Sequence, residues 1–278
     1  MRTLVHLSDL HFGRIDTSLI QPLTNLVNGI HPDLLVVSGD LTQRARSAQF
    51  KEARLFLDAL PEPQIVVPGN HDIPLHNLFN RFLRPLDKYR RYICTNTEPV
   101  YIDAEIAVMG LNTARSLTVK NGRINPEQIA RIRARLLSLS PHLIKIIVTH
   151  HPFDLPAQIG TKHLVGRAEM AMQGFADCGA DLLLAGHVHA SHAGSTACRY
   201  PINDYAALVV QAGTATSTRG RGEANSFNVV RIDAPQVAIE RFEWSSQRCN
   251  FVHIETTTFR RNNANWLQVG GSECRAPD

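Results

Sequence analysis

The most informative stretch of the sequence is Val67-Pro68-Gly69-Asn70-His71-Asp72. An apolar strand ends there in a turn that presents three polar side chains together. Four other polar clusters also come directly after apolar runs. They are Asp9-Leu10-His11, Gly39-Asp40, His150-His151-Pro152 and Gly186-His187-Val188-His189. Loops that leave the carboxyl ends of strands share one edge in open α/β sheets. The five clusters therefore predict one shared site.

Helices and strands alternate between these clusters. Uninterrupted apolar runs predict buried strands at residues 3–7, 33–38, 64–67, 105–111, 143–149 and 181–185. Apolar residues at intervals of three and four predict helices at residues 19–30, 50–60, 126–139 and 168–178, and an interrupted helix at 75–92. The alternation then stops, and residues 207–212, 226–232 and 237–244 are predicted as consecutive antiparallel strands. The predicted fold class is α/β.

Composition narrows the class of protein. Hydrophobic residues make up 44% of the 278 residues and charged residues 19%, which is typical of a globular chain. No apolar run approaches the roughly 18 residues of a membrane span, and the N-terminus has no signal-peptide pattern, so we expect a cytoplasmic protein. A net charge of +4 with scattered basic residues favours a small anionic partner over a stable nucleic-acid complex. The five cysteines lack Cys-x-x-Cys spacing, which argues against a disulfide framework.

The polar clusters supply ligands that suit transition metals. The set contains two carboxylates, one amide and four imidazoles, from Asp9, Asp40, Asn70, His11, His150, His187 and His189. Nitrogen and oxygen ligands without thiolate favour manganese, iron, zinc or cobalt over calcium. Seven ligands exceed the needs of one ion, whereas two ions about 3.5–4 Å apart could share them. In an extended chain, residues two apart point to the same side, so the Asp-x-His and His-x-His pairs are each predicted to chelate an ion.

Taken together, these motifs resemble those of the calcineurin-like metallophosphoesterases. The family pattern D-x-H, G-D, G-N-H-[DE], H and G-H-x-H is matched in order between residues 4 and 189. The resemblance implies a sandwich of two mixed β-sheets flanked by helices. It implies that one ion is held by Asp9, His11 and His189, the second by Asn70, His150 and His187, and that Asp40 bridges both. The implied catalytic residues are His71, outside the metal coordination spheres, and Asp72, which would orient it.

The resemblance also implies a reaction, the hydrolysis of a phosphodiester by a water that two metal ions activate. Manganese or iron is expected, with zinc or cobalt as alternatives. Residues 8–13 and 39–42 are similar to those of bacterial class III cyclic nucleotide phosphodiesterases and glycerophosphodiesterase-like enzymes, which implies a small substrate such as a cyclic nucleotide. We expect a catalytic domain at residues 1–245 and a C-terminal strand, arm or tail at 246–278, where a homodimer contact could form.

Two alternatives stay open. One is the pyrophosphatase that cleaves UDP-diacylglucosamine in lipid A synthesis, which would need an apolar cavity and membrane association; residues 75–92 are the segment that could face a membrane. The other is a non-catalytic binding protein on the same fold. Three residues have no assigned role: His151 could orient a ligand, Arg115 could meet a phosphate, and His192 lies three residues after a predicted ligand.

Overall fold

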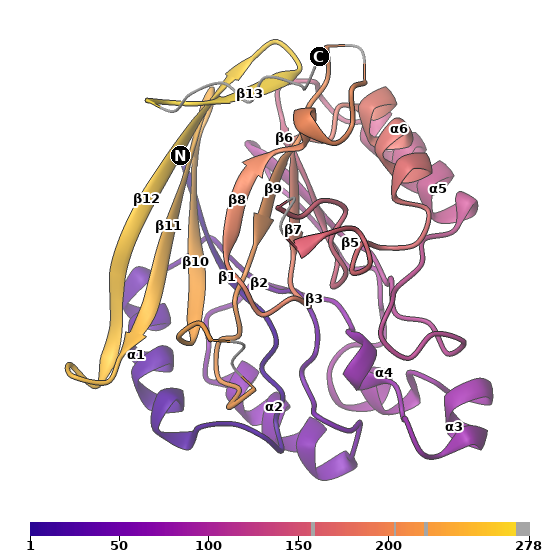
Figure 1. Ribbon diagram of the computed structural model, residues 1–278, viewed down its shortest axis with the longest axis vertical. Coiled ribbons are helices and arrows are strands. Elements are labelled where there is room, and N and C mark those ends of the chain that lie inside the picture. Colours follow the sequence, from indigo (N-terminus) through magenta and orange to yellow (C-terminus); the bar gives the residue numbers. More distant parts are fainter. Residues whose placement is uncertain (157–158, 203, 220–221, 271–278) are drawn as a thin grey trace.

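The predicted strands form two β-sheets that pack face to face, with helices on the outer faces (Figure 1). The computed structural model describes residues 1–156, 159–202, 204–219 and 222–270. The expected fold class, an α/β sandwich of two mixed sheets, is confirmed. Within the described residues, no helix is long and apolar enough to cross a bilayer.

The first sheet contains the N-terminal strands and the C-terminal hairpins. Among the described residues it has seven strands in the order β13-β12-β11-β10-β1-β2-β3. Their bounds are Arg2–Leu7 (β1), Leu34–Val37 (β2), Gln64–Val66 (β3), Ser226–Asp233 (β10), Gln236–Ser245 (β11), Asn250–Asn262 (β12) and Asn265–Gln268 (β13). β1, β2 and β3 run parallel, whereas β10 to β13 form an antiparallel meander. Residues 271–278 of the predicted C-terminal arm lie outside the described residues.

The second sheet corrects one prediction. In the described part of the chain it has six strands in the order β4-β5-β6-β7-β9-β8. Their bounds are Val100–Ile102 (β4), Ile106–Gly110 (β5), Ile144–Val148 (β6), Leu182–Ala185 (β7), His192–Ser195 (β8) and Leu208–Gln211 (β9). Residues 207–212 were expected beside 226–232, but β9 pairs in parallel with β7 instead. All four residues of β9 are buried, and a place between β7 and β8 covers both of its edges.

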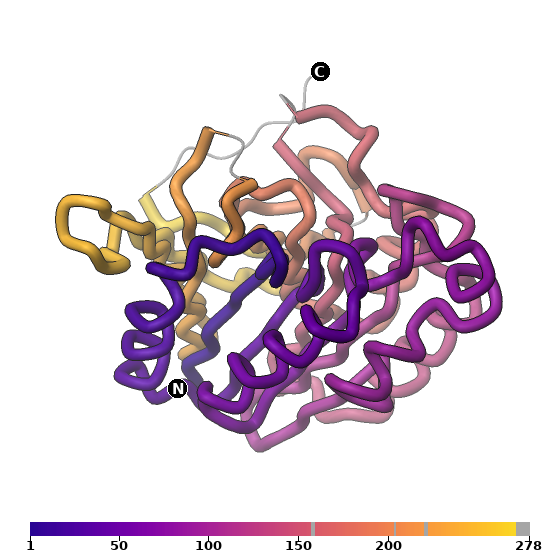
Figure 2. The backbone as a smooth tube through the Cα atoms, turned by 90° about the horizontal axis from the view of Figure 1, so that it is seen from below, coloured from indigo at the N-terminus to yellow at the C-terminus, as the bar shows by residue number. Residues whose placement is uncertain are grey.

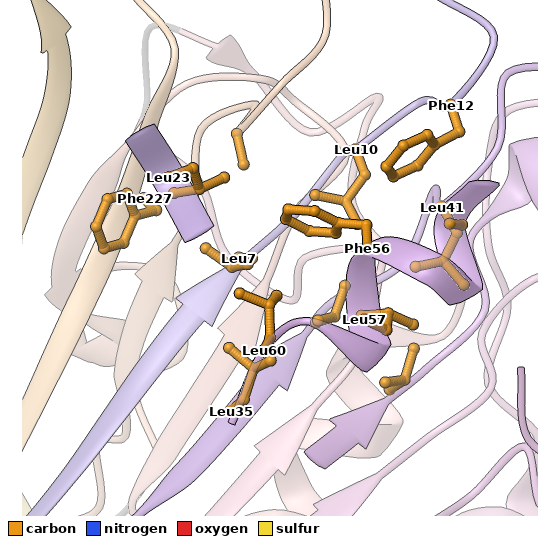
Figure 3. Close-up of a cluster of buried hydrophobic side chains, with 14 of the residues drawn as sticks. Leu7, Leu10, Phe12, Leu23, Leu35, Leu41, Phe56, Leu57, Leu60 and Phe227 are labelled. Carbon is orange, nitrogen blue, oxygen red and sulfur yellow. The ribbon is translucent and has the colours of Figure 1, made fainter. Parts of the chain in front are cut away.

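Helices cover both outer faces. Their bounds are Ile20–Ile30 (α1), Ser47–Asp58 (α2), Leu78–Leu83 (α3), Asp87–Tyr92 (α4), Pro126–Leu137 (α5) and Ala168–Cys178 (α6). Figure 3 shows Phe56 and Leu57 of α2 in one apolar cluster with Leu7 of β1 and Leu35 of β2. Helices α5 and α6 pack on the second sheet in the same manner. The interrupted helix at residues 75–92 is α3 and α4, which lie on either side of Pro85.

A third apolar cluster fills the space between the two sheets. It combines Leu4 and Val36 of the first sheet with Ile146, Val148 and Leu184 of the second, all fully buried. This core fixes the sheets against each other, so loops from both sheets can meet at one edge.

Viewed from below, the N-terminal third of the chain lies in front, in indigo and purple (Figure 2). Cys94, Cys178 and Cys249 are free thiols, while Cys198 is disulfide-bonded, a bond that the cysteine spacing did not indicate.

Candidate metal centre

Hydrogen bonds join the loops that carry the five polar motifs, and the N–H of His71, in the motif at residues 67–72, donates to Oδ1 of Asp40 at 2.8 Å. The N–H of Asp9, after β1, donates to the carbonyl of Gly39, after β2, at 3.1 Å. In the second sheet, the N–H of Gly186 donates to the carbonyl of His150 at 3.0 Å. His150 then joins the sheets, because its Nδ1 donates to the carbonyl of Ser38 at 2.8 Å. The predicted ligand loops are therefore one connected unit.

The local backbone differs from the predicted extended geometry. The five carboxylate and imidazole positions in the D-x-H, G-D and G-H-x-H motifs have positive φ, namely Asp9 (52°), His11 (53°), Asp40 (54°), His187 (78°) and His189 (60°). Side chains other than glycine are strained in this left-handed region, by about 1–2 kcal/mol each. The paired side chains thus converge through tight turns that follow β1 and β7, and the argument from an extended strand was wrong.

Glycines at two motif positions are needed for close packing. A Cβ on Gly69 would collide with Oδ1 of Asp40, and a Cβ on Gly186 would collide with the hydroxyl of Ser8. Both glycines precede predicted ligands, Asn70 and His187. Their small size allows the carboxylates to lie beside the neighbouring turns, and any larger residue would push the ligand loops apart.

One group of ligand atoms is formed by Asp9, His11 and His189. Nε2 of His189 lies 3.2 Å from Oδ1 of Asp9 and 3.3 Å from Nε2 of His11, and Oδ1 of Asp9 lies 3.5 Å from Nε2 of His11. Ligands of one ion lie about 2.0–2.2 Å from it and hence about 3.0–3.5 Å from each other. Oδ1 of Asp9 is buried and accepts no hydrogen bond from the described residues. The geometry fits a metal ion.

A second group surrounds His150. Its Nε2 lies 3.1 Å from Oδ1 of Asn70 and 3.3 Å from Nδ1 of His187. Oδ2 of Asp40 connects the two groups, since it lies 3.4 Å from Nε2 of His150 and 3.7 Å from Nε2 of His11. The seven side chains predicted as ligands therefore lie together, with Asp40 between two sets of three.

The charges of the metal-free site are set by burial and by the carboxylates. Burial opposes ionisation of Asp9, but His189 and His11 hold its pKa well below the usual value. Burial likewise opposes ionisation of Asp40, and His150 outweighs it and lowers that pKa too. Burial disfavours charge on His150, yet Asp40 raises the pKa of His150 to about 9. Burial lowers the pKa of His187 to about 3. His150 thus holds a proton at neutral pH.

Metal binding at the His150 group should therefore release a proton. At about pH 7.5 His150 is protonated, and its Nε2 must lose that proton to become a ligand. We expect release of about one proton, and an affinity that falls about tenfold for each pH unit below 9. Calorimetric titration of manganese in buffers of different ionisation enthalpy measures both quantities. His150→Gln should lose the release, whereas the exposed His253→Gln should keep it; no proton release by the wild type would contradict the prediction.

Hydrogen bonds orient several predicted ligands. The hydroxyl of Ser8 donates to Oδ2 of Asp9 at 2.6 Å, and the N–H of His187 donates to the same atom at 2.9 Å. Both ring nitrogens of His151 are occupied: Nδ1 lies 2.8 Å from the hydroxyl of Thr113 and Nε2 lies 2.9 Å from the carbonyl of Lys120. The His151 ring packs against His187, with ring centroids 4.6 Å apart. His151 thus supports a neighbouring ligand residue by packing.

Of the two predicted catalytic residues, His71 lies at the metal-ligand cluster. Its ring centroid is 4.9 Å from that of His11, and its N–H donates to Oδ1 of Asp40 at 2.8 Å. Nδ1 of His71 lies 2.8 Å from the carbonyl oxygen of Gln43, and Nε2 lies 2.9 Å from Nη1 of Arg219. Arg219 was missed in the sequence, since it follows no recognisable motif. The imidazole is therefore held from both sides.

Asp72 has a different environment. Its carboxylate accepts from the N–H groups of Leu41, Thr42 and Gly69, at 3.2, 2.9 and 2.9 Å, and from the hydroxyl of Thr42 at 3.0 Å. Burial, followed by the charge of Asp40, raises the pKa of Asp72 to about 7. The carboxylate of Asp72 thus connects two segments by accepting hydrogen bonds from backbone N–H groups. One segment is the turn that contains His71, and the other is the loop that contains Asp40.

Asp72→Asn should destabilise the protein strongly. Four donors face the carboxylate, and an amide would turn its own NH₂ group toward some of them, which leaves buried donors unpaired. We expect a loss of about 2–4 kcal/mol in the free energy of unfolding, measured by urea denaturation. The matched change Asp58→Asn, in an exposed ion pair with Arg54, should cost less than about 1 kcal/mol. Equal losses in the two variants would show that the turn does not depend on this carboxylate.

Other residues considered in the sequence lie away from this cluster. Arg115 donates to the carbonyls of Asn112 and Ala114 and to Gln128, so it ties a loop to the start of α5. His192 lies in β8, where it lines a separate cavity of about 210 Å³ with Arg241. Within the described part of the chain, neither is hydrogen-bonded to a predicted ligand.

The fold is an α/β sandwich, and carboxylates, an amide and imidazoles lie together at the ends of its strands. This combination is typical of metal-binding α/β proteins. The family model of the calcineurin-like phosphoesterases matches residues 2–191, and the chain belongs to this family. The resemblance seen in the sequence motifs is thereby confirmed.

Curated relatives carry the names of phosphodiesterases. Glycerophosphodiester phosphodiesterase GpdQ of Enterobacter lignolyticus is 37% identical over 94 residues, which cover 30% of this chain and 33% of that protein. A cAMP/cGMP dual specificity phosphodiesterase of Mycobacterium tuberculosis is 26% identical over 261 residues, which cover 82% of this chain and 75% of that protein. The match thus spans a third of the first relative's length and three quarters of the second's.

Solved structures support the fold. A dimetal phosphatase from Danio rerio superposes with a TM-score of 0.65 at 14% identity, covering 92% of this chain and 98% of that one. A purple acid phosphatase from yellow lupin reaches a TM-score of 0.71 at 12% identity, covering 94% of this chain and 54% of that one. At these identities the likeness shows the fold alone.

Proposed function

We propose that this protein is a dinuclear-metal hydrolase of phosphodiesters. The observation that carries the proposal is the position of Oδ2 of Asp40, between the group of Asp9, His11 and His189 and the group around His150. A carboxylate that contacts both sets of ligands suits two neighbouring ions better than one. Manganese or iron, with zinc or cobalt as alternatives, matches the nitrogen and oxygen donors.

The proposal assigns a separate role to each group of site residues. Asp9, His11 and His189 would hold one ion, Asn70, His150 and His187 would hold the other, and Asp40 would be shared between them. Such a pair of ions supplies a water of lowered pKa and a positive charge beside the phosphoryl group. His71 lies against the first group of ligands. Its Nε2 accepts from Arg219 in this structure, so His71 would meet the phosphoryl or departing oxygen only after substrate displaces that hydrogen bond. Asp72 maintains the turn that positions His71.

A small diester, such as a cyclic nucleotide, is the proposed substrate class, because both curated relatives described above are named as phosphodiesterases. We expect the manganese-loaded protein to cleave bis(p-nitrophenyl) phosphate with a kcat/KM at least about tenfold above that for p-nitrophenyl phosphate. A panel with cyclic AMP, glycerophosphodiesters and single-stranded DNA then ranks natural substrates. Preference for the monoester would move the assignment to a phosphatase.

One observation favours the second candidate, a pyrophosphatase that acts on UDP-diacylglucosamine. Helix α3 exposes four apolar side chains, Leu78 (64%), Phe79 (64%), Phe82 (53%) and Leu83 (66%). This helix is tied to the rim of the candidate site, since Arg81 donates to the carbonyl of Thr118 at 2.7 Å and Asn70 donates to the carbonyl of Val119. An apolar surface there suits acyl chains. Faster hydrolysis of the nucleotide-lipid than of any simple diester, reduced by Phe79→Ser, would favour this candidate.

A further inference from the structure

The loop after β9 is attached to the loop that carries Asp9 and His11. The hydroxyls of Thr214 and Thr216 donate to the carbonyls of Asp9 and Leu10, both at 2.7 Å. The N–H of Ala215 donates to the carbonyl of Ser8 at 3.0 Å. Residues 214–216 are at most 1% exposed, so these bonds are shielded from water. The loop is therefore a fixed part of the candidate metal centre, although more than 200 residues separate it from Asp9.

The end of this loop carries Arg219 to the site. The N–H of Thr218 donates to the carbonyl of Arg14 at 3.1 Å, and the hydroxyl of Ser217 accepts from the N–H of Arg219 at 3.1 Å. Asn225 closes the loop from the other side, as its amide donates to the carbonyl of Ser217 at 2.9 Å. The backbone around Arg219 is thus held by main-chain and short side-chain bonds, independently of the guanidinium.

The guanidinium points at His71. A carbonyl oxygen only accepts, so the Nδ1 of His71 carries the hydrogen that bonds to Gln43. A guanidinium only donates, so the Nε2 of His71 accepts from Nη1 of Arg219 at 2.9 Å. The carbonyl of Gln43 by itself fixes which ring nitrogen of His71 carries the hydrogen. Arg219 places a cation beside a residue that packs on the predicted metal ligands.

We propose that Arg219 is a substrate-binding residue whose guanidinium binds a non-bridging oxygen of the phosphodiester. This inference rests on the proposed function. A phosphodiester has two non-bridging oxygens and one negative charge, and a planar guanidinium fork bonds such oxygens with charge-assisted hydrogen bonds. One oxygen would lie against the metal ions and the other would face Arg219.

Inorganic phosphate is the probe for the test, because it reports anion binding without any chemical step. Calorimetry measures its affinity for the manganese-loaded wild type, Arg219→Met, Arg219→Lys and the matched control Arg248→Met, an exposed arginine of the β11–β12 hairpin. We expect Arg219→Met to weaken phosphate binding about 30-fold, Arg219→Lys to weaken it less, and Arg248→Met to leave it unchanged. Manganese content should stay the same in all four proteins.

A second pair of variants separates binding from positioning. If Arg219 contacts the anion, Arg219→Met should weaken phosphate binding by a similar factor in the wild type and in His71→Ala. An effect that disappears in the His71→Ala background would overturn the proposal and make Arg219 a positioning residue for His71. Unchanged phosphate affinity in Arg219→Met would also overturn it. Failure to cleave any diester would count against the proposed function alone, because phosphate affinity is measured without turnover.

Discussion

Asp40→Ala should remove bound metal and lower kcat by about 10³-fold or more, the largest effect that we expect from one substitution. Oδ2 of Asp40 lies 3.4 Å from Nε2 of His150 and 3.7 Å from Nε2 of His11, so its removal also leaves these two buried imidazoles without their shared carboxylate. Elemental analysis of the purified variant should find less than one ion per chain, where the wild type holds close to two.

The first control for this variant is a measurement that its fold is intact. The sheets and their core do not include Asp40, so the circular dichroism of the variant should match that of the metal-free wild type. Asp58→Ala, which changes an exposed carboxylate of α2, should keep both ions and full turnover. Turnover that survives in a metal-free Asp40→Ala protein would remove the basis for a metal-dependent hydrolase. A wild type that binds two ions but cleaves no phosphoester would instead favour the non-catalytic alternative.

His71→Ala should separate turnover from metal content. The His71 ring packs against His11, but its two nitrogens are bonded to Gln43 and Arg219 and not to the ligand set. We therefore expect both ions to remain and kcat for bis(p-nitrophenyl) phosphate to fall by about 10²–10³-fold, the usual worth of a positioned acid or charge-stabilising group. Steady-state kinetics and elemental analysis on the same preparation measure both quantities.

His150→Ala is the informative comparison for this variant, because the same kind of side chain is removed from a predicted ligand position. It should lose metal and activity together. If His71→Ala also lost metal in proportion to its activity, His71 would be a ligand, and its role outside the coordination spheres would have to be abandoned.

The buried strands and the position of the candidate site could be predicted because both depend on local patterns, whereas the two-sheet sandwich was expected from the family resemblance. Apolar runs marked the buried strands, and short polar motifs marked the turns that follow them. Once β1 and β2 lie side by side, the turns that carry Asp9 and Asp40 must also be neighbours. The same argument applies to β6 and β7, which carry His150 and His187.

Three features could not be predicted, because they depend on contacts between distant segments. The buried run of β9 has the same pattern in either sheet, and only tertiary packing places it beside β7. Strand β8 is a short His-Ala-Gly-Ser segment without apolar alternation, so no local signal marks it. Arg219 reaches His71 across 148 residues of chain, from a polar loop whose sequence resembles an ordinary connection.

The strained left-handed turns lower the stability of the protein at positions where the proposed metal site needs charged or imidazole side chains. These positions are Asp9, His11, Asp40, His187 and His189. Glycine tolerates such turns far better than aspartate or histidine. In the proposed enzyme, exchanging one of these residues for glycine would relieve backbone strain but would remove a metal ligand, and at Asp9 it would also remove the carboxylate that accepts from the buried hydroxyl of Ser8. A protein that used this scaffold without metal ions would have no need of the strained turns, whereas the proposed enzyme must retain them.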